Sequence, residues 1–87
     1  MTVRRHFLVE RYVAAGDVAS VAAALRLLAG SPPHGARHVC SLVIPDEETC
    51  LSVFEGTDAS AVAAVNETAG LPLERIVEAE WIPGRPT

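Results

Sequence analysis

The sequence predicts an α+β fold in which strands and helices follow one another in the order βαββαβ. Two segments carry apolar residues at helical spacing, and each is closed by glycine and proline. Runs of β-branched and aromatic residues stand at both ends of the chain, and two more are joined by an acidic turn. Two crossovers of helical length then give an antiparallel sheet of four strands with both helices on one face, the ferredoxin-like sandwich.

Turn and capping residues divide these elements. Asp17 is placed to cap the first helix, and the acidic run after Pro45 forms the hairpin turn. Gly70 and Pro72 close the second helix. The expected elements are a strand over residues 3–13, a helix carrying Val18 to Leu28, strands over 36–44 and 49–55, a helix carrying Val62 to Ala69, and a strand over 75–82.

Length and composition indicate a single ferredoxin-like domain over residues 1–87, with 83–87 as a tail. Because 49% of the residues are hydrophobic and a chain of 87 residues buries little of its surface, a homodimer is expected. A net charge of −4 without a basic run argues against nucleic acid or an anionic membrane as partner. All seven basic residues are arginine, which excludes Schiff-base chemistry and a P-loop lysine.

The N-terminal residues do not resemble an export signal, because the apolar run after His6 is broken at Glu10. The apolar segment from Val18 to Gly30 is interrupted by Arg26 and is too short to span a bilayer. A cytoplasmic protein is therefore expected. There, cysteines stay reduced, and Cys40 and Cys50 do not form a CxxC zinc motif.

Alternation along each strand divides the side chains between the two faces of the sheet. On the face covered by the helices we expect Phe7, Val9, Val39, Val43, Leu51, Val53, Val77, Ala79 and Trp81. On the open face we expect His6, Leu8, Glu10, Tyr12, His38, Cys40, Leu42, Ile44, Cys50, Ser52, Phe54, Glu78 and Glu80.

An open face this apolar predicts that a second subunit packs its own sheet there and encloses a cavity. In the strand order 4-1-3-2, Glu78 and Glu80 are expected beside His6 and Glu10. A hairpin loop over residues 46–48 pairs Ile44 with Cys50 and Cys40 with Phe54, which separates the two cysteines and predicts no disulfide.

Three sets of residues are candidates for function. His38 and Cys40, two positions apart on one strand, supply two ligands for a transition metal, with Glu10 as a third; alternatively they only line a dimer interface. His6, Glu10 and His38 are candidates for moving a proton. Ion pairing with the neighbouring Arg5 or Arg11 is the simpler interpretation of His6 and Glu10. The residues expected to contact a small ligand are Leu8, Tyr12, Leu42, Ser52 and Phe54.

Several runs also resemble one known family. They are Val9-Glu10-Arg11, Cys40-Ser41-Leu42-Val43, Leu51-Ser52-Val53-Phe54-Glu55 and Ala69-Gly70-Leu71-Pro72. They resemble the small ferredoxin-like family, widespread in actinobacteria, that includes a nickel-binding protein and has dimers of the α+β barrel type. The resemblance implies an actinobacterial source.

The chain departs from the family pattern where metal ligands are expected. The family's hairpin opens Trp-x-His-Ser-Tyr, where this chain has His38, Cys40, Ser41 and Leu42. Cys and Tyr of the family's third strand are replaced by Ser52 and Phe54, and a frequent His of the second helix by Val65. These changes remove imidazole, thiol and phenol groups, so His38 and Cys40 either rebuild a related site or serve another ligand.

Two classes of function follow from this comparison. The first is a small homodimeric binding protein that holds a small ligand or a divalent transition metal, with nickel as a candidate, on the open face. The second is a cofactor-free enzyme of the dimeric α+β barrel type, such as a cyclase, isomerase or small monooxygenase.

Overall fold

A computed structural model describes residues 5–30, 35–80, 82 and 84 of the chain. It contains four strands, two α-helices and two short 3₁₀ turns. In chain order these are β1 (Arg5–Tyr12), η1 (Ala15–Asp17), α1 (Val18–Leu27), β2 (Ala36–Ile44), η2 (Pro45–Glu47), β3 (Thr49–Gly56), α2 (Ala59–Thr68) and β4 (Arg75–Ala79).

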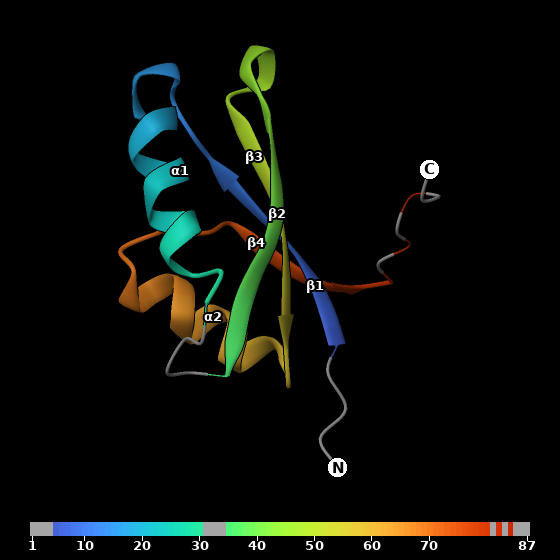
Figure 1. The fold of residues 1–87 in the computed structure, drawn as a ribbon. Coiled ribbons are helices and arrows are strands. Elements are labelled where there is room, and N and C mark those ends of the chain that lie inside the picture. The colour runs from blue at the N-terminus through green and yellow to red at the C-terminus, as the bar shows by residue number, and fades with distance from the viewer. Residues whose placement is uncertain (1–4, 31–34, 81, 83, 85–87) are drawn as a thin grey trace.

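The strands form one antiparallel sheet in the order β2-β3-β1-β4. Figure 1 shows this sheet nearly edge-on, with α1 and α2 both on one side of it. The predicted ferredoxin-like fold and strand order are therefore confirmed. Among the described residues, no helix is long and apolar enough to span a membrane.

The core lies between the helices and the covered face of the sheet. Phe7, Val9 and Phe54 of the central strands are buried there, against Leu25 of α1 and Val62 of α2. Asp58 caps α2, because its carboxylate accepts a hydrogen bond of 2.8 Å from the amide of Ala61. Asp17 occupies the corresponding position before α1, but its side chain makes no capping hydrogen bond.

The observed register of the β2–β3 hairpin differs by one residue from the expected one. The loop runs from Pro45 to Glu48 instead of over residues 46–48 alone, and Glu48 takes a left-handed conformation with φ of 49°. Thr49 consequently pairs with Ile44, and Cys50 with Val43. A slip of one residue turns every side chain of a strand to the other face. Leu51 and Val53 therefore lie on the open face, and the covered face receives Cys50, Ser52 and Phe54.

A β-bulge between His38 and Cys40 makes a second correction. Cys40 pairs with Val53, but His38 pairs with Phe54, so Val39 is an additional residue without a place in the regular register. The bulge moves His38 to the covered face, whereas Cys40 and Leu42 stay on the open face as expected. Without it, strict alternation would place Val39 inward and His38 outward.

The last strand is also reversed relative to the expectation. Ile76 pairs with Val9 and packs against the core, so Val77 and Ala79 lie on the open face. Glu78 pairs with Phe7 on the helix side, near the exposed end of the sheet, where it forms an ion pair of 3.8 Å with Arg5. Glu78 is therefore not beside His6 and Glu10 on the open face. Trp81 lies outside the described residues.

Candidate functional site

The open face of the sheet presents cross-strand rows of side chains. Its most apolar row runs across all four strands through Cys40, Val53, Leu8 and Val77. The next row begins with Leu42 and Leu51, and Leu42 is 68% exposed. This face therefore offers a continuous apolar surface that neither α-helix covers.

One end of the open face is ionic. His6 and Glu55 are cross-strand partners, and His6 Nε2 lies 3.7 Å from Glu55 Oε2. Arg37 reaches the same carboxylate from β2, with Nε 3.2 Å from Oε1 and Nη2 3.4 Å from Oε2. An imidazole and a carboxylate thus stand next to the apolar row, with Arg37 neutralising the carboxylate.

Glu10 occupies the other side of the apolar row. Its Oε1 lies 3.4 Å from Nε of Arg75, its partner on β4. The expected ion pairing of Glu10 is present, but the arginine comes from β4. A metal ion at Glu10 would have to compete with Arg75.

His38 is on the opposite face from Cys40 and Glu10, so the structure does not bring these three predicted metal ligands together. Its Nε2 lies 2.7 Å from Ser41 Oγ, and its ring packs edge-on against Phe54 with centroids 5.5 Å apart. Burial lowers the pKa of His38; the charge of Arg11 acts in the same direction, and a hydrogen bond with the Cys40 backbone opposes it.

His38 begins a chain of polar groups inside the molecule that the sequence analysis missed. Ser41 Oγ lies 2.6 Å from Ser52 Oγ, which lies 3.7 Å from Cys50 Sγ. Cys50 and Ser52 are both fully buried. The sequence could have predicted this cluster from the alternation of Cys50, Ser52 and Phe54. Only the observed hairpin register, however, assigns these residues to the interior.

The two predicted ligand-contacting residues Ser52 and Phe54 are therefore in the core, whereas Leu8, Tyr12 and Leu42 lie on the open face. The cysteines are free thiols on opposite faces. Within the described parts of the chain, no three His, Cys, Asp or Glu residues are grouped closely enough to hold a metal ion.

The lowered pKa of His38 predicts a pH-dependent stability. Because the folded state resists protonation of this ring, the unfolded state binds the proton more readily, and stability falls as the pH drops below the unfolded value of about 6.5. Urea unfolding between about pH 5 and 7.5 should show this loss in the unmodified protein and a smaller one in His38→Gln. His6→Gln is the matched control, because it removes an imidazole from the open face, and it should retain the loss. An equal change of unfolding free energy with pH in the unmodified protein and in His38→Gln would contradict the prediction.

Comparison with known proteins identifies the family. The family model described as "Nickel responsive protein SCO4226-like" matches residues 3–79. The chain belongs to this family. The crystal structure of SCO4226 from Streptomyces coelicolor A3(2) is similar to the chain, with a TM-score of 0.70 and 20% sequence identity over 90% of this chain and 99% of that one. This likeness confirms the fold, and a comparison with curated proteins returns no match.

Membership of the SCO4226-like family agrees with the resemblance found from the sequence runs. The family's description connects it with nickel, and nickel is bound well by imidazole. Among the residues that the structure describes, His6 is the histidine on the open face, beside Glu55 and two strands away from Cys40.

Proposed function

We propose that this protein is a homodimeric metal-binding protein whose open sheet face packs against that of a second copy and holds a transition metal there. Nickel is the first metal to test, because the family is described as nickel responsive. The observation that carries the proposal is the uncovered apolar row with an imidazole and a carboxylate at its edge.

The apolar row supports the dimer. Leu8, Val53 and Val77 adjoin one another in the middle of an open face, with Leu42 and Leu51 beside them. Burial of such a surface contributes about 25 cal/mol for each Å² of apolar area removed from water, before the entropic cost of association is subtracted. A two-fold dimer buries the same patch on both copies, so each residue contributes twice.

The donors on this face support a site shared between subunits. One chain offers His6 and Glu55 as neighbours, and Cys40 farther along the face. Two donors from each of two chains make up the four ligands that a borderline divalent metal commonly takes. Nickel would have to displace Arg37 from Glu55. Because the ligands would come from both chains, metal binding and dimer formation should strengthen each other.

The test is thermal unfolding of chelator-treated protein with and without nickel, together with its mass in solution. A metal that binds only the native state at 100 times its dissociation constant adds about 2.7 kcal/mol, which is several degrees for a small domain. The unmodified protein should have the mass of a dimer and should be stabilised by nickel. His6→Ala should lose that stabilisation.

His38→Ala is the matched control, because it removes an imidazole from the covered face of the same sheet. It should keep the nickel-dependent shift, although its basal stability changes. Equal shifts in His6→Ala and the unmodified protein would contradict the assignment of His6, and a loss in His38→Ala alone would place the metal on the other face. Absence of any shift with nickel, zinc, copper or cobalt would contradict the metal-binding function.

A further inference from the structure

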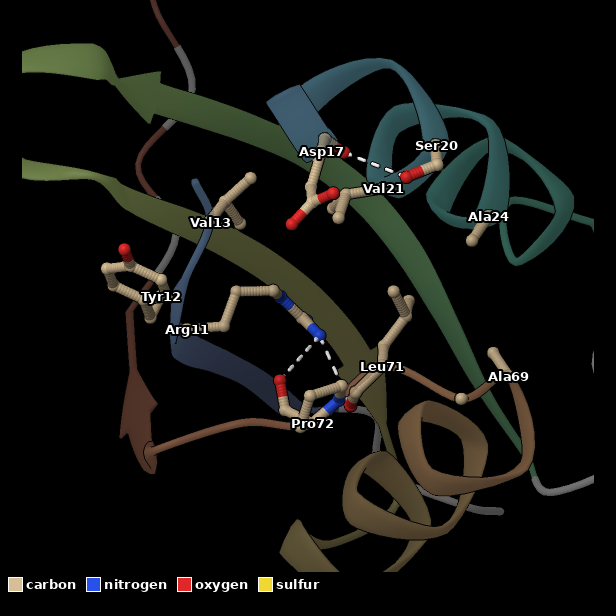
Figure 2. Close-up of a pocket in the computed structure, with 11 residues that line it drawn as sticks. Arg11, Tyr12, Val13, Asp17, Ser20, Val21, Ala24, Ala69, Leu71 and Pro72 are labelled. Carbon is tan, nitrogen blue, oxygen red and sulfur yellow. Dashed lines mark hydrogen bonds between the residues drawn. The ribbon is translucent and has the colours of Figure 1, made fainter. Parts of the chain in front are cut away.

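A cavity of about 310 Å³ lies mainly on the helix side of the sheet, with Tyr12 at the end of β1 as the one described residue that lines it from the open face. It is bounded by the end of β1, the start of α1 and the loop between α2 and β4 (Figure 2). Its volume is at the lower end of the range for small-molecule sites. The proposed metal site uses none of the cavity's residues, so a ligand of the cavity can be tested independently of that function.

The guanidinium of Arg11 forms part of the cavity wall and is unusual in its partners. Arg11 is only 2% exposed, so its charged guanidinium lies in the interior of the protein. Nη2 donates to Asn66 Oδ1 at 2.7 Å, and Nη1 has only long contacts of 3.4 and 3.5 Å with the carbonyls of Leu71 and Pro72. Nε is buried with no hydrogen-bond partner.

These oxygen acceptors are neutral. Burial lowers the pKa of Arg11, and the side chain of Cys50 opposes this through an electrostatic interaction and a hydrogen bond. In the described part of the chain, no carboxylate forms an ion pair with Arg11. An arginine stays protonated at any ordinary pH, and a buried charge without an opposite charge is strongly unfavourable. Asp17 lines the same cavity but forms no ion pair with Arg11, so the guanidinium can still accept an anionic partner.

The start of α1 adds a second positive feature to the same cavity. The helix runs for ten residues from Val18 to Leu27, and the side chain of its N-cap residue, Asp17, makes no hydrogen bond to it. The 3₁₀ turn η1 runs directly into α1, so this segment contributes the positive end of the helix dipole rather than a set of free amides. Asp17, Ser20 and Val21 from this turn line the cavity with Arg11 (Figure 2).

Much of the remaining lining is apolar, which constrains what the anion carries. Val21 and Ala24 of α1 face Leu71 and Pro72 across the cavity (Figure 2). An inorganic ion would leave these walls in contact with water, whereas a short hydrocarbon chain would cover them. We propose that this cavity binds a small organic carboxylate, with its charged group at Arg11 and its hydrocarbon part against Val21 and Leu71.

Asp17 sets the strength of this site. Its exposed carboxylate lines the same cavity and is drawn on the side facing Arg11 in Figure 2. A like charge at the mouth repels an incoming anion, and it repels a dianion more than a monoanion. The site is therefore specific for monocarboxylates and becomes stronger when the charge of Asp17 is removed.

The experiment measures binding of hexanoate by isothermal titration and by amide chemical shifts. Hexanol and inorganic phosphate serve as probes that lack the charge and the hydrocarbon chain, respectively. Hexanoate should bind saturably, shift amides around Arg11 and the start of α1, and bind roughly tenfold more tightly than either probe. Asp17→Asn should tighten hexanoate binding about three- to tenfold.

Glu80→Gln is the matched control, because it makes the same change in net charge at an exposed residue beyond the far end of β4; it should leave the affinity unchanged. Arg11→Gln should abolish binding if it folds, and Asp17→Asn keeps the proposal testable if it does not. No saturable binding, equal affinities for hexanoate and hexanol or for hexanoate and phosphate, or equal tightening in Asp17→Asn and Glu80→Gln would each overturn the proposal.

Discussion

Truncation of Phe54 to alanine is expected to lower the free energy of unfolding by about 3–5 kcal/mol. Phe54 is fully buried, pairs across the sheet with Phe7, and has the ring of His38 packed edge-on against it. Removing the ring leaves a cavity between three packed elements. Because a domain of this size is marginally stable, the loss is a large part of its total stability. Urea unfolding monitored by circular dichroism measures it.

The control for this prediction is Leu27→Ala on α1. Leu27 is 84% exposed, so its truncation should change the unfolding free energy by no more than about 0.5 kcal/mol. If Phe54→Ala leaves too little folded protein to measure, Phe54→Leu keeps most of the volume and should cost less. A loss below about 1 kcal/mol in Phe54→Ala would contradict the observed registers, because the pairings of β3 with β2 and with β1 both place this ring inside.

The same register explains which parts of the fold were predictable from the sequence. The order of elements and the strand order follow from turn residues and periodicity, and they are confirmed. The sequence does not determine which side chains of β3 face the helices, because Leu51 and Val53 are as apolar as Cys50 and Phe54. The choice depends on Pro45, which belongs to the loop, and on Glu48, whose left-handed conformation no sequence pattern indicated.

The bulge at Val39 shows a second limit. A bulge inserts one residue without any required composition, and strict alternation had placed Val39 inward and His38 outward. The candidate metal set of Glu10, His38 and Cys40 depended on that alternation. His6, by contrast, lies in a regular stretch of β1, and its place on the open face was predicted correctly.

Arg11 could have been found from the sequence and was not. Alternation puts it in phase with Phe7, Val9 and Val13, all of which are buried. A charged residue at an inward position of a central strand predicts either a buried partner or a ligand, because a buried charge needs one. The run Val9-Glu10-Arg11 supports the family resemblance of the first strand but does not by itself assign a partner to Arg11. The structure adds the observation that the Arg11 side chain lines a cavity.

The second prediction concerns Leu42, on the edge strand of the open face. Leu42→Asp is expected to weaken the proposed dimer at least 100-fold, roughly 2.7 kcal/mol. The change removes an apolar side chain from the contact and adds a carboxylate that would be buried, and the two-fold axis doubles both effects. Leu42 is 68% exposed in the single chain, so the fold itself should tolerate the change. Sedimentation equilibrium over a range of concentrations measures the dissociation.

Leu27→Asp is the control, since it changes a leucine of similar exposure on α1, away from the open face. It should remain as dimeric as the unmodified protein. Both variants carry the same added charge, so general repulsion between negatively charged chains acts equally on them. A dimer that survives Leu42→Asp and dissociates in Leu27→Asp would move the interface to the helices. A protein that is monomeric without any substitution at tens of micromolar would contradict the homodimer, and with it a metal site built from two copies of His6 and Glu55.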